Sequence, residues 1–263
     1  MQPHNINIKD KIITINDYSY RRNPPKKYSL NDKVMAYFDG YDRKIVPLDI
    51  AYSYPIIYDK YIASDQQFHD MTIAICPFTL ACATFDGKFV PTDYVENSCL
   101  VITNNKDTFA ICNSFNHILK LNHKKFEIDI KILRNIFTEY PDCKYITLNK
   151  DIDIQPLINP NYYLNKDILF EVPTLPSSQF HYKTLTYLIQ YISSKDQSVK
   201  STIIIGRNAN KDTSTGYNVI ESGIYDYIMQ YDNDIKQKFG LVMPILWFAW
   251  KSFFPNSKII YLP

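Results

Sequence analysis

The residues best placed to do chemistry lie in one short segment, Cys76-Pro-Phe-Thr79, which puts a thiol and a hydroxyl three positions apart. The apolar run before it, Thr72 to Ile75, predicts a buried strand, and a proline lacks the N–H that a β-ladder needs. We therefore predict a turn here, with both side chains beside exposed backbone N–H groups. A thiol in such surroundings has a lowered pKa, and its thiolate serves as a nucleophile or a metal ligand.

Two aspartates and one histidine extend this candidate site. A carboxylate pair on adjacent strands, here Asp59 and Asp86, does acid–base work or holds a cation. His69 is the nearest histidine in sequence to the cysteine. An enzyme built here requires four side chains to converge within about 4–6 Å of one another, those of Asp59, Cys76, Thr79 and Asp86. The competing interpretation is structural, because free cysteines are among the most buried residues and aspartates commonly cap turns.

A polar loop, Gly206 to Gly216, follows a β-branched run that predicts a buried strand, Ser201 to Ile205. Ligand sites of α/β folds form at such loops. Its basic and hydroxyl side chains make a candidate phosphate site, with Arg207, Lys211 and Thr213 as binding residues. The spacing is not that of a Walker A loop, so a plain surface loop is the alternative. The sequence identifies no cofactor, and we predict a solvated loop, not a metal site, at His117 and His123.

The first half of the chain is predicted to be mostly β. Apolar and β-branched runs indicate strands, at residues 11–15, 34–38, 44–48, 72–85, 99–103, 108–112 and 144–148. Two turn sequences, Asp39-Gly40 and Asn104 to Asp107, predict hairpins. Apolar residues with helical spacing predict a helix from Asp129 to just before Pro141.

The second half is predicted to contain more helix. Helices are expected over Phe180 to Ser193, Gly223 to Tyr231 and Ile245 to Phe253, with Pro244 in the first turn of the last. Strands are expected at Ser201 to Ile205 and Lys258 to Leu262. The predicted fold is therefore α+β, with an antiparallel β-rich first half closed by a helix–strand unit. Three segments are expected: an N-terminal strand and arm (1–33), a β-rich domain (34–150) and an α/β half packed on it (151–263).

One pattern occurs twice, 114 residues apart. Tyr140-Pro-Asp-Cys-Lys-Tyr-Ile-Thr-Leu148 matches Phe254-Pro-Asn-Ser-Lys-Ile-Ile-Tyr-Leu262 in residue type, and each copy follows an apolar helical segment. The shared physical unit is a helix, a proline stop, a tight turn and a buried strand. A degenerate duplication and the chance reuse of a common solution both explain the match.

Composition and charge narrow the choice of partners. With 46% hydrophobic residues the chain can bury a large core. Its formal net charge is only +2, so it has no clear excess of positive charge for binding nucleic acid or an anionic membrane. The five cysteines include no Cys-x-x-Cys pair, which disfavours a disulfide framework and an all-cysteine zinc site. No apolar run is long enough to span a bilayer, so we expect a cytoplasmic protein.

The abundance of Ile, Asn, Lys and Tyr indicates an AT-rich genome, such as that of a giant DNA virus, which would place the protein in host cytoplasm or virion.

A basic, proline-containing arm, Tyr20-Arg-Arg-Asn-Pro-Pro-Lys-Lys27, places four positive charges within eight residues. Nucleic-acid binding through Arg21, Arg22, Lys26 and Lys27 is one hypothesis, and a solvated linker is the favoured interpretation. Besides nucleic acid, the partners that we consider are another protein and further copies of this chain in a homo-oligomer.

Several segments together resemble the domain of unknown function 3179, a bacterial and archaeal family without an established activity. The matching segments are Asp42 to Leu48, Ile56 to Asp59, Cys76 to Thr79 with Phe85-Asp86, Asn97 to Ile102, and both Tyr140 to Leu148 and Trp247 to Leu262. Four family residues are replaced: a histidine by Tyr54, a glutamate by Pro55, an asparagine by Tyr58 and a glycine by Leu80.

The missing histidine and glutamate decide the functional expectation. If the family site is a Cys/His pair, this chain has lost half of it. We therefore expect a non-catalytic binding or structural module on a family-like scaffold. The alternative is an enzyme or metal-dependent protein with the four-residue site around Cys76.

Overall fold

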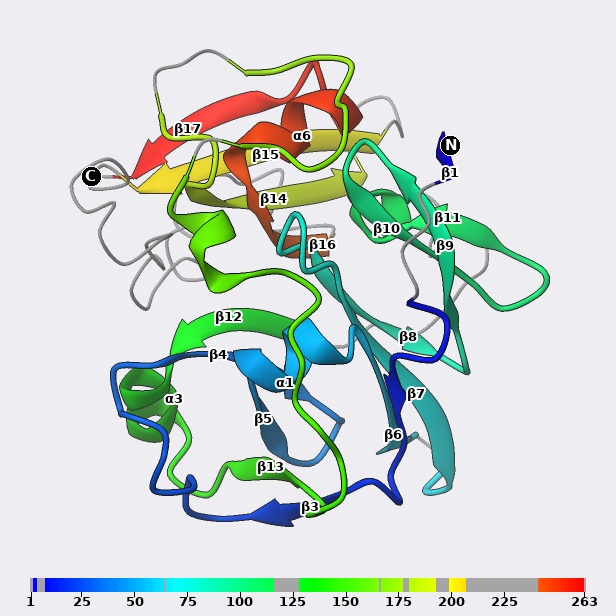
Figure 1. Ribbon diagram of the computed structural model, residues 1–263, viewed down its shortest axis with the longest axis vertical. Helices are drawn as coiled ribbons and strands as arrows, with labels where there is room; N and C mark the ends of the chain where they lie inside the picture. Colours follow the sequence, from blue (N-terminus) through cyan, green and yellow to red (C-terminus); the bar gives the residue numbers. More distant parts are fainter. Residues whose placement is uncertain are drawn as a thin grey trace.

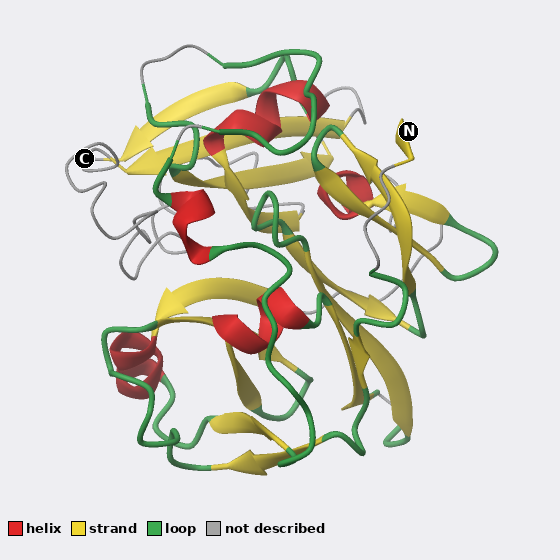
Figure 2. Ribbon diagram, viewed as in Figure 1, coloured by secondary structure: helices red, strands yellow, loops and turns green. Residues whose placement is uncertain are grey.

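The computed structural model describes residues 2–3, 8–63, 65–115, 128–165, 167–176, 180–192, 199–206 and 241–262. They form a mixed α/β, strand-rich structure with four sheets and a few short helices (Figures 1 and 2). The mixed class predicted from the sequence is confirmed. The candidate phosphate residues Arg207, Lys211 and Thr213, the two loop histidines and the predicted helix at 223–231 lie outside the described residues.

The first sheet has the strand order β12-β4-β5-β13-β3. Its strands are β3 (Tyr18–Arg21), β4 (Lys33–Phe38), β5 (Arg43–Pro47), β12 (Ile128–Ile132) and β13 (Lys144–Leu148). The predicted hairpin at Asp39-Gly40 joins β4 to β5, with Gly40 at φ +95°. An Asp39 carboxylate oxygen closes the turn by accepting the N–H groups of Tyr41 (2.8 Å) and Asp42 (2.7 Å).

A second sheet, order β16-β14-β15-β17, is built from the other half of the chain. Its strands are β14 (Leu185–Ile192), β15 (Val199–Gly206), β16 (Leu241–Leu246) and β17 (Lys258–Leu262). In each of the two sheets a short helix follows the strand that precedes the last one in the chain: α3 (Leu133–Glu139) after β12 and α6 (Trp247–Phe253) after β16. Figure 1 shows α6 lying against the upper sheet.

The two sheets share strand order, direction and register over four strands. Both begin with an antiparallel hairpin, add a third strand antiparallel to the first, and add a fourth parallel to the second. Ile132 pairs with Lys33 just as Leu246 pairs with Leu185. Lys44 likewise pairs with Lys144 as Thr202 pairs with Lys258. The two patterns that match in sequence therefore occupy the same place in two equivalent sheets.

The helix ends of the two sheets are alike as well. Tyr140 and Phe254 each precede a proline and have φ values of −136° and −134°. Each donates its N–H to the carbonyl four residues earlier, in Ile136 and Trp250. A following proline disfavours the helical conformation, so an aromatic residue followed by proline ends both helices.

Two further sheets complete the structure. One has the order β2-β6-β7-β8, formed by β2 (Ile12–Ile13), β6 (Ile56–Ile62), β7 (Phe68–Ile75) and β8 (Cys82–Asp86). The other has the order β1-β9-β10-β11, formed by β1 (Gln2–Pro3), β9 (Val90–Glu96), β10 (Cys99–Thr103) and β11 (Thr108–Ala110). The short helices are α1 (Leu48–Ser53), η1 (Ile111–Asn113) and η2 (Pro160–Tyr163). The hairpin predicted around Asn104 to Asp107 joins β10 to β11.

Three helix predictions need correction. The helix expected over Phe180 to Ser193 is wrong, because residues 185–192 form β14. Its apolar residues happened to fit helical spacing, but six of its eight residues are buried, so it is a strand covered on both faces. The helix expected from Asp129 begins only at Leu133, since Ile128, Ile130 and Ile132 alternate along β12. The last helix begins at Trp247, and Pro244 lies in the edge strand β16, where a proline is tolerated.

The main core lies where the halves of the chain meet. β8, β12 and β16 contact one another there, and the Tyr187 hydroxyl donates to the Ile130 carbonyl (3.2 Å) across the junction. Trp247 and Trp250 are each about 1% exposed, as expected for core residues. Among the described residues, no helix has the length and apolar character that crossing a membrane requires.

Candidate functional site

The Cys76–Thr79 segment forms a tight turn between β7 and β8, as predicted, and it lies inside the protein. The Cys76 N–H donates to the Ala81 carbonyl, and the Cys76 carbonyl accepts from the Leu80 N–H, both at 2.8 Å. We call residues 76–79 the Cys-Pro turn. Its four residues are buried.

The second half of the chain binds the remaining carbonyls of the Cys-Pro turn. The Pro77 carbonyl accepts from the Tyr163 hydroxyl, and the Phe78 carbonyl accepts from the Tyr162 hydroxyl at 3.1 Å. The Thr79 carbonyl accepts from the backbone N–H of Leu246 at 2.8 Å, where β16 meets α6. The turn thus connects the halves of the chain by hydrogen bonds from η2 and from the second sheet.

The Cys76 thiol is enclosed. It is 0% exposed, its sulfur accepts the Leu100 N–H at 3.2 Å, and it contacts the Cys99 thiol. Burial raises the pKa of Cys76 well above its ordinary value, with the neighbouring Cys99 adding to the rise. Thr79 contacts the sulfur of Cys112 at 3.7 Å. The alternative of an activated thiolate at Cys76 is therefore not favoured, because the turn is buried and the Cys76 N–H is already bonded within the protein.

Leu80 has a backbone conformation that favours glycine. Its φ of +60° is left-handed, which costs a non-glycine residue about 1–2 kcal/mol. Glycine adopts such a conformation without strain. Leu80 is fully buried, so its packing offsets that cost.

Asp59 belongs to a different buried group. One of its carboxylate oxygens accepts hydrogen bonds from Tyr37 (2.6 Å), Tyr20 (2.8 Å) and Lys44 (2.6 Å). Lys44 also pairs with Asp39 at 2.7 Å. We call these five residues the Asp59 cluster. Burial, and then the negative charge of Asp59, raise the pKa values of Tyr20 and Tyr37 far above their ordinary range, which keeps both phenols neutral.

The four predicted site residues do not converge. Asp59 pairs with Met71, and Met71 pairs with Asp86, so the intervening strand β7 separates the two aspartates. They are not on adjacent strands, and two strand spacings put their backbones about 10 Å apart. Cys76 lies five residues beyond Met71, or roughly 16 Å along the strand direction. Asp86 instead accepts a hydrogen bond from the Tyr61 hydroxyl at 3.1 Å.

Lys183 is a buried charged group that sequence reasoning missed. Its side chain is 0% exposed, and its ammonium donates to the carbonyls of Asp167 (2.6 Å) and Tyr162 (3.2 Å). The ammonium also lies over the Tyr162 ring. Burial lowers the pKa of Lys183 to about 7. Nothing in the sequence distinguishes this lysine from those on the surface.

The shifted pKa of Lys183 predicts a pH-dependent stability. An unfolded lysine titrates near 10.4, so the unfolded chain binds more protons between pH 7 and 10. The stability of the wild type relative to Lys183→Met should therefore rise across this window, by up to about 1.4 kcal/mol per pH unit. Urea unfolding of both proteins at pH 7, 8 and 9 measures the difference. Lys150→Met, at an exposed lysine, is the control with no slope, and a flat Lys183→Met difference would contradict the assignment.

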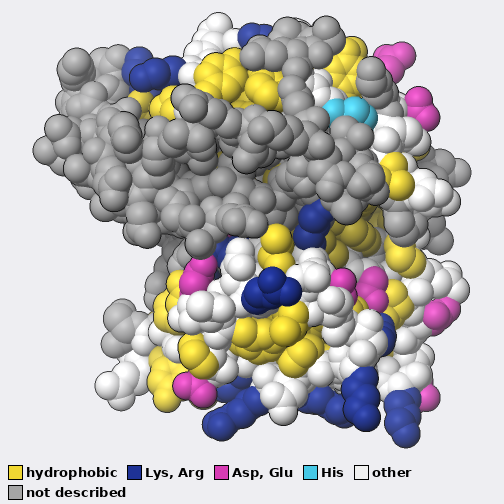
Figure 3. Space-filling model, turned by 90° about the vertical axis from the view of Figure 1, so that its left-hand side faces the viewer, with side chains coloured by type: hydrophobic (Ala, Val, Ile, Leu, Met, Phe, Trp, Pro, Cys, Tyr) yellow, Lys and Arg dark blue, Asp and Glu magenta, His cyan; other side chains and the backbone are white. Residues whose placement is uncertain are grey.

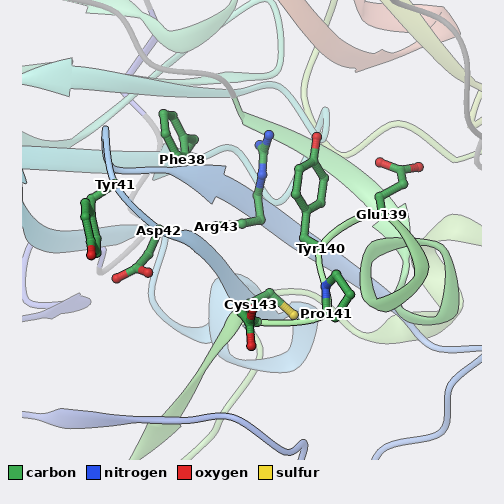
Figure 4. A pocket seen from close by; sticks show the side chains of 9 residues that line it. Phe38, Tyr41, Asp42, Arg43, Glu139, Tyr140, Pro141 and Cys143 are labelled. Carbon is green, nitrogen blue, oxygen red and sulfur yellow. The ribbon is translucent and has the colours of Figure 1, made fainter.

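An open surface groove has a ligand-sized volume of about 450 Å³. It lies between the β4–β5 turn and the α3–β13 connection, and we call it the Arg43 groove (Figure 4). The guanidinium of Arg43 lies 4.4 Å from the Tyr140 ring centre and 5.6 Å from that of Phe38. Tyr41 is 75% exposed at one side. Asp42, Glu139 and Asp142 contribute carboxylates to the lining.

Two segments far apart in the sequence meet at this groove. Asp42 to Leu48 runs into β5, and Tyr140 to Leu148 runs into β13, and these strands pair in parallel. Sequence reasoning missed the groove, because only the pairing of distant strands brings the segments together. In the second sheet the positions of Arg43 and Cys143 are occupied by Ser201 and Ser257, whose hydroxyls hydrogen-bond at 2.6 Å.

Comparisons with protein-family models, curated proteins and solved structures found no match for this chain. The resemblance to the domain of unknown function 3179 stays a prediction. Among the residues that the structure describes, no group of three or more His, Cys, Asp or Glu side chains is arranged to hold a metal ion.

The basic arm lies on the surface. Arg21, Arg22, Lys26 and Lys27 are exposed, and Lys27 pairs with Asp49 at 3.2 Å. Figure 3 shows Lys and Arg side chains gathered along the lower edge of the molecule, the end at which Figure 1 places β3.

Proposed function

We propose that this chain is a non-catalytic protein-binding module and that the Arg43 groove is its binding surface. The observation that carries the proposal is the arginine held between two aromatic rings beside an exposed tyrosine. Tyrosine and arginine are enriched in the energetically dominant parts of protein interfaces. The rigid side chain of tyrosine loses little conformational entropy when a partner binds.

The role of the Cys-Pro turn supports a non-catalytic function. Its thiol is enclosed, its pKa is raised, and its carbonyls hold the second half of the chain. A nucleophile requires a lowered pKa and access to substrate. The environment of Cys76 favours neither, so the most suggestive motif in the sequence is better explained by packing.

One carboxylate of the groove suits a basic ligand segment. Of the three carboxylates in the lining, Asp42 pairs with Lys144 and Glu139 pairs with Lys131, whereas Asp142 is exposed and makes no ion pair with the described residues. Exposed aromatic walls also suit proline, because aromatic-lined grooves bind preformed polyproline segments at a low entropic cost. We therefore propose a ligand that combines Lys or Arg with proline.

Peptide display tests this proposal. Selection of random displayed peptides on the immobilised full chain should enrich basic, proline-containing sequences that bind in the micromolar range, about 1–100 µM. Tyr41→Ala removes an exposed ring and should weaken their binding about tenfold or more.

Tyr94→Ala is the matched control, because Tyr94 is 44% exposed on another sheet, in β9. It should leave affinity unchanged within about twofold. Failure to enrich any peptide, or enriched peptides that bind the Tyr41→Ala variant equally well, would overturn the proposal.

We also infer that the two equivalent sheets derive from a duplicated module. Four strands with one shared register, two helices of equal length and two matching helix ends support this origin. The serine pair in the second sheet is consistent with specialisation of the first copy for binding.

A further inference from the structure

We propose that the Arg43 groove binds the basic arm, residues 20–27, of a second copy of this chain. This inference rests on the proposed function, since it names the partner of the same groove. The chain itself contains a segment with the chemistry that the groove favours, namely four basic residues around Pro24-Pro25. The exposed Asp142 carboxylate suits the basic residues of the arm, and the aromatic side chains of the groove suit its prolines. This complementarity is the basis of the pairing.

The backbone of the arm is restricted before binding. Proline fixes its own φ near −65°, and it directs the preceding residue to extended or polyproline conformations. Asn23 and Pro24 both precede a proline. The arm then closes with a turn in which the Tyr28 N–H donates to the Pro25 carbonyl at 3.0 Å. Residues 23–25 are therefore restricted before binding, and such a proline segment loses little entropy when it enters an aromatic groove.

The charged groups of the arm are available to a partner. Arg21, Arg22 and Lys26 are exposed, and Lys27 makes a surface ion pair with Asp49. Exposed pairs of this kind contribute about 0–1 kcal/mol, so a partner carboxylate can replace Asp49. On the groove side, Asp142 is exposed, whereas Glu139 already pairs with Lys131 and Asp42 with Lys144. Asp142 is thus the carboxylate best placed to receive a new cation.

The arm does not occupy the groove of its own chain. The groove is lined by Phe38, residues 41–43 and residues 139–143, with none from the arm. Tyr20 and Arg21 are held in β3 against β13, and Lys27 and Tyr28 reach Asp49 at the start of α1. The groove of each copy therefore remains open to the arm of another.

Both surfaces lie at the same end of the first sheet. Arg21 ends β3 and pairs with Tyr145 near the start of β13, and residues 139–143 of the groove lead directly into that strand. Two copies related by a twofold axis can then exchange arms, because each presents an arm and a groove side by side. A self-complementary surface of this kind is what a symmetric dimer requires.

Sedimentation equilibrium of the full chain tests the exchange. The wild type should dimerise with a Kd in the micromolar range, since two short arms bury a small interface, and the Kd should rise as salt increases from about 50 to 500 mM. Asp142→Lys in the groove and the pair Arg22→Glu with Lys26→Glu in the arm should each raise the Kd about tenfold or more. All three positions are exposed, so folding is expected to be unaffected.

Mixing the groove variant with the arm variant distinguishes direct pairing from general charge effects. A reversed groove should accept a reversed arm, so the mixture should regain association at one to one. A wild type that is monomeric up to about 1 mM, or a dimer insensitive to both variants, would overturn the inference. If displayed peptides still bind the groove in that case, the proposed function stands with another partner; if no peptide binds either, both fail.

Discussion

Replacing Asp59 by alanine is expected to lower the free energy of unfolding by about 3–5 kcal/mol, the usual cost of removing one member of a buried ion pair. Asp59 is 3% exposed and accepts hydrogen bonds from Tyr20, Tyr37 and Lys44. Alanine would remove the carboxylate acceptor of the buried Tyr37 phenol and of the half-buried Tyr20 phenol. It would also leave the Lys44 ammonium with Asp39 alone. Urea unfolding followed by circular dichroism at pH 7 gives the difference directly.

Asp70→Ala provides the matched control for this loss. Asp70 pairs with Lys88 at 3.4 Å, but both side chains are about half exposed, so its removal should cost no more than about 1 kcal/mol. Lys44→Met should be costly as well, and the double variant with Asp59→Ala should cost less than the sum of the two. Additive losses, or an Asp59→Ala cost like that of the control, would contradict a coupled buried cluster.

Phe78→Ala is expected to cost about 3–5 kcal/mol, the range for a deleted buried phenylalanine. The Phe78 side chain is 2% exposed, and its ring contacts that of Phe170 edge-on with centres 4.8 Å apart. Its loss opens a cavity inside the Cys-Pro turn, where the second half of the chain is bound. The measurement is again the urea midpoint, together with the slope of the transition.

Phe68→Ala is the control for Phe78→Ala. Phe68 belongs to the same strand that leads into the turn, but it is 70% exposed, so truncation should change stability by no more than about 0.5 kcal/mol. A similar small change for Phe78→Ala would mean that the turn is not part of the structural core.

Local patterns of the sequence predicted local structure well. Asp39-Gly40 and Asn104 to Asp107 form the expected hairpins, and the helix, proline and strand pattern occurs at both expected places. These features depend on residues close in sequence, such as a proline that ends a helix or a side chain that closes a turn. Prediction failed where the apolar spacing suits both a helix and a buried strand. Residues 185–192 have apolar positions that suit a helix, yet they form a strand buried on both faces.

The site could not be derived in the same way, because it depends on distant residues. The enclosure of Cys76 comes from Leu100 and from the second half of the chain, at Tyr162, Tyr163 and Leu246. Asp59 finds Lys44 only through the pairing of different strands. The Arg43 groove joins segments about a hundred residues apart through β5 and β13. The adjacent cysteine and proline therefore identified an important turn from the sequence. They did not show whether its role is catalytic or structural.

The rate of iodoacetamide labelling at Cys76, followed by mass spectrometry of the intact full chain and its peptides from pH 5 to 10, is the sharpest test of a structural Cys-Pro turn. We expect Cys76 to remain unlabelled until the protein unfolds, because it is 0% exposed with a raised pKa. Lys150→Cys, at an exposed position, should label rapidly in the same sample. Fast labelling of Cys76 with a midpoint well below the free-thiol value of about 8.5 would instead mean an accessible thiolate, and the non-catalytic role of the turn would be wrong.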